Sequence, residues 1–286
     1  LDTQAQYTGF KNRIINGDMR IDQRNNGAAV TISGSVYTLD RWRVGYSSDA
    51  VMSFQRVADA PAGFTNSVRC AVTTSEPTGA FDLLYLQQNI EGFNAADFNF
   101  GTANAQPITA SFWVKSSLTG AKSFSFINGA LNRSYCTTYT ISSANTWEYK
   151  TITVPGDTTG TWNTDNSVGI ELHFNFAVGS NYETTLNSWN NGRVYSDSAT
   201  PDFTTTAGAT INITGVQLEK GSTATAFDYR DYGRELSMCQ RYYETSIDAN
   251  ALGFSGQVTS GSAYYISGVF AVEKRAAPAM VFVAGV

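Results

Sequence analysis

Hydrophobic and polar residues alternate along most of the first 220 positions of the chain. In VMSFQRV, for example, Met52 and Phe54 fall on one side and Ser53 and Gln55 on the other. A period of two is typical of a β-strand that buries one face. The pattern predicts strands over residues 12–21, 36–46, 51–57, 67–74, 83–90, 109–116, 123–127, 134–141, 147–154, 168–178 and 210–219.

These strands predict an all-β fold, because no helical period and no strand–helix–strand alternation precedes residue 228. The fitting architecture is an antiparallel two-sheet jelly-roll sandwich. Within it we expect two hairpins, one joining 109–116 to 123–127 and the other joining 134–141 to 147–154. We also expect the first strand, from residue 14, to lie beside the last one, 210–219.

The period changes after Asp231. Tyr232, Leu236, Cys239 and Tyr243 follow one another at offsets of four, three and four, which predicts one stripe of a short helix. Asp228 or Asp231 is the expected N-cap. The stripe either packs against the chain's own sandwich or forms a short seam between subunits. Beyond it, 264–272 and 280–283 read as the strands of a small hairpin.

The predicted organisation has four parts. Residues 1–11 are an N-terminal arm or linker, 12–220 the sandwich, 221–249 a linker and the helix, and 250–286 a C-terminal β module. That module is too small to bury a core of its own, so it needs the sandwich, another subunit or further chain.

Composition narrows the classes of function. Charged residues make up 15% of the 286 positions, the net charge is −5, and no basic run occurs, which argues against a nucleic-acid surface. No apolar run approaches 18 residues, so we expect no membrane insertion. Three widely spaced cysteines and a single histidine disfavour a zinc site, and no cofactor is predicted. The cysteines are expected to be buried thiols.

One pair of side chains has the spacing for acid–base chemistry. Glu171 and His173 are two positions apart in a predicted strand and therefore share one face. A hydrogen-bonded structural pair explains them more simply. Because the chain has no nucleophile motif, we expect a protein that is not an enzyme.

Two segments have the composition of a sugar-binding surface, in which an aromatic ring stacks on the sugar and amides or charges bind its hydroxyls. The first contains Trp162, Asn163 and Asp165; the second contains Trp189, Asn190 and Arg193. The second lies within 182–206, a long polar excursion of the kind that carries binding surfaces. The simpler alternative is that both tryptophans anchor loops.

Two motifs resemble proteins of bacteriophage tails. NRIINGDMRIDQR at 12–24 with YTLDRW at 37–42 is similar to the opening of tail-fibre and tail-appendage proteins, and GVQLEKGSTATAF through CQRYYE at 215–244 resembles a later segment of them. The resemblance implies a virion structural protein with a sandwich of carbohydrate-binding-module type. It also implies a homotrimer, contacts with other tail proteins and recognition of a host-surface glycan.

The same resemblance raises the question of calcium, because such sandwiches often hold a structural calcium ion between the first and last strands. Asp18 and Glu219 would be its oxygen donors. Arg20 stands where an acidic residue is expected, so a salt bridge from Arg20 to Glu219 is the alternative.

Two other functions stay open. One is a non-catalytic carbohydrate-binding module of a secreted bacterial protein, and the other is a polysaccharide-degrading enzyme. A pair of carboxylates facing each other across a groove would favour the enzyme.

Overall fold

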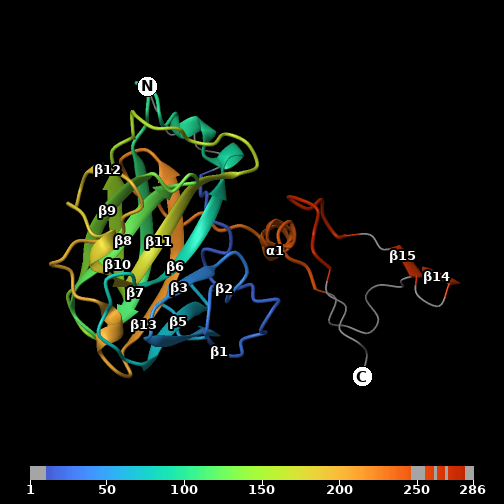
Figure 1. Cartoon of the computed structure of the whole chain (residues 1–286), viewed down its shortest axis with the longest axis horizontal. Coiled ribbons are helices and arrows are strands. Elements are labelled where there is room, and N and C mark those ends of the chain that lie inside the picture. The colour runs from blue at the N-terminus through green and yellow to red at the C-terminus, as the bar shows by residue number, and fades with distance from the viewer. Residues whose placement is uncertain (1–10, 246–254, 261–262, 268–269, 281–286) are drawn as a thin grey trace. The chain divides into compact units, whose positions relative to one another are not determined.

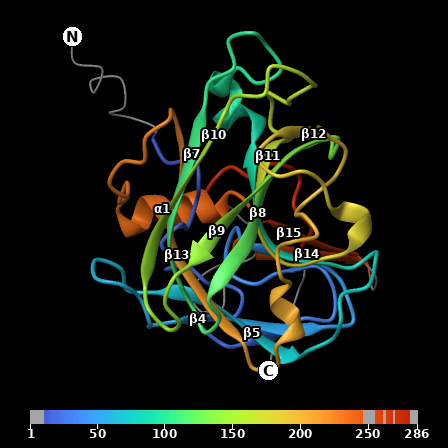
Figure 2. The same ribbon diagram turned by 90° about the vertical axis from the view of Figure 1, so that its left-hand side faces the viewer.

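A computed structural model describes residues 11–245, 255–260, 263–267 and 270–280, and it divides the chain into two compact units, Leu1–Tyr229 and Arg230–Val286. The first unit is built from two antiparallel sheets packed face to face, and both layers can be followed in Figures 1 and 2. The predicted all-β, two-sheet antiparallel sandwich is therefore confirmed.

The first sheet has six strands. Its order is β1 (Val30–Thr31), β4 (Val51–Val57), β5 (Ser67–Thr74), β13 (Thr210–Lys220), β7 (Ile108–Ser116) and β10 (Glu148–Val154). The last strand in sequence, β13, therefore lies in the middle of the sheet, between β5 and β7.

The second sheet has seven strands. Its order is β12 (Trp189–Asn191), β9 (Arg133–Ile141), β8 (Gly120–Asn128), β11 (Val168–Val178), β6 (Leu83–Glu91), β3 (Arg43–Ser47) and β2 (Val36–Tyr37). Four 3-10 turns complete the unit: η2 (Gly92–Asn94), η3 (Ala96–Phe98), η4 (Ser180–Tyr182) and η5 (Phe203–Thr205).

Both predicted hairpins are wrong. Strand β7 pairs with β10 and β13 in the first sheet, whereas β8 pairs with β9 and β11 in the second. The connections from β7 to β8 and from β9 to β10 therefore cross between the sheets. Alternation identifies the buried face of a strand, but two strands on opposite sides of one core show the same alternation as two hydrogen-bonded neighbours.

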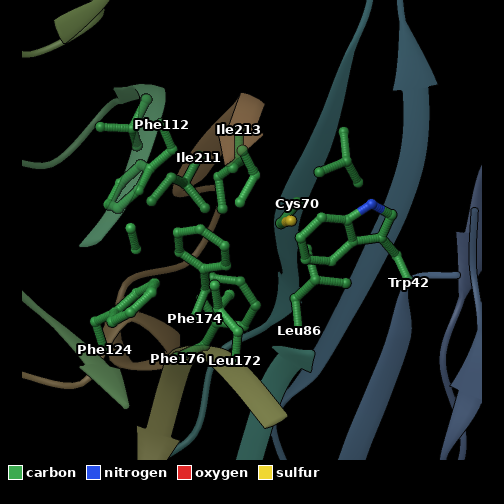
Figure 3. Close-up of a cluster of buried hydrophobic side chains, with 14 of the residues drawn as sticks. Trp42, Cys70, Leu86, Phe112, Phe124, Leu172, Phe174, Phe176, Ile211 and Ile213 are labelled. Carbon is green, nitrogen blue, oxygen red and sulfur yellow. The ribbon is translucent and has the colours of Figure 1, made fainter. Parts of the chain in front are cut away.

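Aromatic side chains fill the space between the sheets. Phe174 of β11 meets Phe112 of β7 and Phe124 of β8, with ring centroids 4.9 and 5.1 Å apart, as Figure 3 shows. Trp42 and these three rings are fully buried. Burying one such side chain contributes roughly 1.5–3 kcal/mol, so this contact between sheets is a main source of stability.

The N-terminal segment lies against β13, as expected, but it is not a strand. The Arg13 amide donates to the Leu218 carbonyl at 3.0 Å, and the Val216 amide donates to the Gly17 carbonyl at 2.9 Å. Asn16 has a φ of 58°, which interrupts an extended ladder. Lys11 reaches the carbonyl of Ala226 at 2.5 Å, so the chain enters and leaves the sandwich at adjacent points.

All three cysteines are buried thiols that form no disulfide bond. Burial raises the pKa of the Cys136 thiol to about 12 and that of the Cys70 thiol well above its ordinary value. Both thiols are therefore protonated and unreactive at neutral pH.

The second unit contains the helix α1 (Tyr232–Gln240). Asp231 is its N-cap and accepts a hydrogen bond from the Arg234 amide at 2.9 Å. The helix ends before Tyr243, so the predicted stripe is wrong at that residue, which follows in a turn. Within the stripe Cys239 is buried, Leu236 is half-buried and Tyr232 is exposed.

A small hairpin follows, formed by β14 (Ser255–Ser260) and β15 (Ala263–Ser267). Strand β15 coincides with the predicted strand 264–272 only as far as Ser267. The predicted strand 280–283 falls almost wholly outside the described residues. Of the helices that the structure describes, none is long and apolar enough to cross a membrane.

Candidate functional site

A pocket of about 140 Å³ opens at one end of the sandwich, where η2 and η3 lie at the top of Figure 1. Its lining comes from two segments, residues 95–102 and 162–170, and none of the lining residues is charged. Phe98 and Ile170 are its buried side chains, whereas Asn99 and Thr164 are exposed. We call this site the end pocket.

Three aromatic rings meet beside the end pocket. The ring centroids of Phe100 and Trp162 are 4.8 Å apart, those of Trp162 and Trp189 5.4 Å, and those of Phe100 and Trp189 5.6 Å, all edge to face. The three side chains are half-buried. The structure therefore brings together the two tryptophans that the sequence proposed separately.

Buried interactions fix the loop that carries Trp162. Arg133 of β9 donates two hydrogen bonds of 2.7 Å to the buried carboxylate of Asp157. The Asp157 carbonyl accepts from the Gly101 amide at 2.7 Å, which ties this loop to the one that carries Phe100. A Cβ at Gly101 would lie 2.6 Å from the Gly160 carbonyl oxygen, so only glycine permits the two loops to come this close.

The polar atoms of both tryptophans already have partners. The Trp162 Nε1 donates to the Thr159 carbonyl at 3.2 Å, and the Trp189 Nε1 donates to the Pro155 carbonyl at 2.8 Å. Neither indole N–H therefore has to be satisfied by a ligand. The rings offer their half-exposed apolar surface, and neighbouring amides and hydroxyls supply the polar contacts.

The other residues predicted to contact a sugar lie in different surroundings. Asn163 lines the end pocket, and its side chain donates to the Val168 carbonyl at 2.9 Å. Asp165 is exposed two residues further on, and a hydrogen bond from the Ser167 amide lowers the pKa of its carboxyl. Asn190 donates to the carbonyls of Thr185 and Ser188 within its own loop.

Arg193 belongs to a different site. Its guanidinium donates to the Tyr195 hydroxyl at 2.7 Å and to the Tyr85 hydroxyl at 3.2 Å. Both rings lie over the outer face of the second sheet, stacked 5.1 Å apart at 18°. We call this cluster the covered layer; its members are Tyr85, Gln87, Glu171, His173, Asn175, Arg193 and Tyr195.

The Glu171–His173 pair lies inside the covered layer, with Oε2 and Nε2 3.0 Å apart. His173 is fully buried and packs edge to face against Tyr85 and Tyr195. Burial lowers the pKa of His173, and the carboxylate of Glu171 opposes that shift. The pair is a hydrogen-bonded structural one and does not face an open groove.

Several polar atoms of the covered layer lack a hydrogen-bond partner. They are the His173 Nδ1, the Gln87 Oε1 and the Asn175 Oδ1, and their side chains are at least nine-tenths buried. Each such atom costs free energy relative to its hydrated state. The covered layer therefore owes its stability to ring stacking and to the hydrogen bonds that its members do make.

The proposed calcium ligands have other partners. Asp18 forms an ion pair with Arg20. Glu219 accepts hydrogen bonds from Gln217 and Thr225 and lies 3.8 Å from the Lys11 ammonium, which differs from the expected pairing of Arg20 with Glu219. Because a cation already accompanies each carboxylate, the two do not fit a calcium site. Among the described residues no group of three or more His, Cys, Asp or Glu side chains is placed to hold a metal.

The sequence analysis missed the residues from the turns after β6, including Phe98, Asn99 and Phe100. The signal was present, because FNFG at 98–101 has the same mixture of aromatic, amide and turn residues as the two segments that were chosen. Without knowledge of the strand pairing, nothing places this turn beside the loop of Trp162.

No protein-family model matches the sequence, and no curated protein matches it. Several solved structures are similar in architecture. The enzymatically active domain of tailspike protein 4 of bacteriophage CBA120 is 15% identical over 73% of this chain, with a TM-score of 0.39. This chain covers only 21% of that tailspike chain.

Two further solved structures match this chain over nearly their whole length. A putative sugar-binding protein from Bacteroides thetaiotaomicron is 10% identical over 73% of this chain and 100% of its own, with a TM-score of 0.42. The family 11 carbohydrate-binding module of a cellulosomal cellulase from Clostridium thermocellum is 13% identical over 69% and 99%, with a TM-score of 0.33. At these identities the likeness concerns the sandwich fold alone.

Proposed function

We propose that this chain is a carbohydrate-binding sandwich and that the end pocket is its glycan site. The observation that carries the proposal is the meeting of Phe100, Trp162 and Trp189 beside a pocket lined by amides and hydroxyls. The C–H groups of a sugar ring pack on aromatic surfaces, and its hydroxyls exchange hydrogen bonds with amides. Because the indole N–H groups are already bonded, the rings would act through their apolar surface.

We further propose that the sandwich is part of a bacteriophage tail fibre or appendage. The support is that the two motifs resembling such proteins pack against each other: the Asn12 side chain accepts from the Leu218 amide at 3.1 Å and donates to the Val216 carbonyl at 3.3 Å. The first motif and the β13 part of the second thus form one structural element. In this role the chain would sit in the virion as a homotrimer, contact other tail proteins and gain avidity from its copies.

The proposed function involves binding without catalysis. Glycoside hydrolysis generally needs two carboxyl groups about 5–10 Å apart across the bond that is cleaved. No residue that lines the end pocket carries a carboxyl group, and Glu171 lies in the covered layer. Purified protein should therefore bind a host polysaccharide and leave its chain length unchanged, which size-exclusion chromatography of the polysaccharide would check.

A binding experiment tests the glycan site directly. Surface polysaccharides of candidate host bacteria would be titrated calorimetrically with the wild-type chain and with Trp162→Ala and Trp189→Ala. Trp147→Ala is the matched control, because Trp147 is also half-buried but lies before β10, whereas the end pocket lies beyond the other end of that strand. Loss of binding in the first two variants alone would support the proposal; equal affinity in all four proteins would refute it.

The solution mass separates the virion role from the main alternative. Light scattering of the full chain, and of a chain that ends at Tyr229, should give a trimer for the first and a monomer for the second. A full chain that is monomeric would instead favour a carbohydrate-binding module of a secreted bacterial protein, which could use the same pocket.

A further inference from the structure

The size of the end pocket limits what part of a glycan it can hold. Its volume of about 140 Å³ is well below the roughly 300–1,000 Å³ of sites for larger small molecules. Binding the interior of a polysaccharide requires a groove that is open at both ends and holds several rings. A pocket of this volume is suited to a single ring, which a glycan presents only at a chain end or at a branch.

The charges around the end pocket limit which ring fits. Acidic sugars are bound through Arg or Lys, and no lining residue is charged. The Arg133 guanidinium below the loop is engaged with Asp157. The exposed carboxylate of Asp165 follows the lining residue Thr164, and its hydrogen bond from the Ser167 amide favours the ionised form. The Arg13 guanidinium, 5.3 Å from the ring centroid of Phe98, is paired with Asp97. Because no lining residue offers a cation to an anionic sugar, the pocket favours neutral rings.

The polarity of the lining adds a further preference. Its accessible apolar surface is formed by Ala95, Ala96, Phe100 and Trp162 above the buried Phe98 and Ile170, whereas the polar residues Asn99 and Thr164 are exposed. A sugar that carries only hydroxyl groups would leave some of them unpaired against this apolar surface, at a free-energy cost. A methyl group would be buried there favourably.

We propose that the end pocket binds a terminal or branch residue of a neutral sugar that carries a methyl group. An N-acetylhexosamine and a 6-deoxyhexose both have this chemistry. The methyl group lies against Ala95 and Ala96, a ring face packs on the aromatic cluster, and the remaining hydroxyls face Asn99 and Thr164. This inference rests on the proposed glycan-binding function and specifies its ligand.

Free monosaccharides are the probes for this inference, used with the full chain in ligand-observed NMR titrations, because a glycosidic methyl group would itself offer the pocket the group under test. N-Acetylglucosamine and rhamnose represent the two methyl-bearing classes, glucose is the neutral control, and glucuronic acid is the anionic control. At least one methyl-bearing probe should bind about fourfold more tightly than glucose, the factor expected for burying one methyl group. Glucuronic acid should bind more weakly than glucose.

A pocket-filling variant completes the test. Ala96 lines the end pocket and is exposed, so Ala96→Leu narrows the site without disturbing the core. It should lower the affinity for the methyl-bearing probe at least tenfold, while Ala62→Leu, an exposed alanine outside the lining, should not.

The outcomes keep the inference and the proposed function apart. If host polysaccharide binds in a way that depends on Trp162 but no single-sugar probe binds, or Ala96→Leu has no effect, the terminal-sugar inference is wrong and the function stands. If glucuronic acid binds most tightly, the inference is also wrong. If no probe and no host polysaccharide binds, the proposed function fails with it.

Discussion

The end pocket and the covered layer use similar side chains in opposite ways. Both combine aromatic rings with amides on strands or loops of the second sheet. In the end pocket the polar atoms of Trp162 and Trp189 are satisfied by backbone carbonyls, and the rings stay half-exposed. In the covered layer Tyr85 and Tyr195 stack on each other, while several buried polar atoms lack partners.

The segment after β11 creates this difference. It supplies Trp189 to the end pocket and then crosses the second sheet, where the Tyr195 carbonyl accepts hydrogen bonds from Ser123 at 2.8 Å and Asn175 at 3.0 Å. The segment after β11 therefore contributes to the open end pocket and also covers the covered layer. Of these two sites, the end pocket is the one that leaves apolar ring surface available to a ligand.

The largest expected effect is on the covered layer. Tyr195 is fully buried, so Tyr195→Ala should lower the free energy of unfolding by about 3–5 kcal/mol, the usual cost of truncating a buried aromatic residue. Urea unfolding would measure the loss, and Tyr149→Ala, at a 43% exposed tyrosine, is the control. A loss below about 1 kcal/mol would mean that this segment does not stabilise the sandwich.

The next effect is on the end pocket. Trp162→Ala should weaken glycan binding roughly 30-fold, equivalent to about 2 kcal/mol, because a tryptophan at the centre of a site commonly contributes that much. Because Trp162 is half-buried, Trp162→Ala should lower the free energy of unfolding of the protein less than Tyr195→Ala does. Calorimetric titration beside urea unfolding measures both quantities, and the reverse order would contradict the assignment of the two sites.

A smaller effect depends on pH. Burial lowers the pKa of His173 in the folded state, so protonation favours the unfolded chain. His173 contributes its full stabilisation at pH values above its unfolded-state pKa of about 6.5. As the pH falls below that value, the free energy of unfolding should decrease by at most ~1.4 kcal/mol per pH unit. The groups that face it are Glu171, Tyr85, Tyr195, Arg193 and Arg43.

His173→Gln isolates this contribution, because other groups titrate in the same range in both proteins. Unfolding free energies between pH 7.5 and 5 should show a smaller decline in the variant. Glycan affinity should not follow the histidine in either protein. Identical pH dependence of stability in the two proteins would show that His173 is not the group that titrates.

The smallest effect is predicted at Arg193. Its guanidinium is bonded to two tyrosine hydroxyls of the covered layer, so Arg193→Met should change glycan affinity less than twofold. If this variant bound glycan as poorly as Trp162→Ala, the assignment of Arg193 to the covered layer alone would be wrong. Arg193 would then be a ligand contact, as its sequence neighbourhood first suggested.

Most positions of the strands could be predicted from the sequence, whereas their pairings could not. Two predicted strands are wrong: residues 12–21 form no strand, and 36–46 is the hairpin of β2 and β3. Alternation in TASFWVKS and SFSFI marks one buried face in each strand, and both faces do enter the same core. Whether two such strands share a sheet depends on the connection between them. The three residues between β7 and β8 turn a corner between the sheets, and no turn motif distinguishes that corner from a hairpin.

The candidate site was predicted in part for a related reason. Tryptophan beside asparagine marked Trp162 and Trp189 as candidate sugar contacts, because such residues are rarely wholly buried, and the structure places the two rings side by side. The same rule grouped Arg193 with Trp189, since they are four residues apart. Their side chains reach different sites because the segment changes direction between them, and that change is set by contacts with Ser134 and Ser123, far away in the sequence.

The adjacent entry and exit of the sandwich have a mechanical consequence. A pulling force applied to the chain on either side of the domain would pass between Lys11 and Ala226 over a short path. The central strand and the aromatic core would carry little of it until those few contacts had peeled apart. The core of such a domain is loaded only after the contacts between its two ends have separated, so those contacts set its resistance to force.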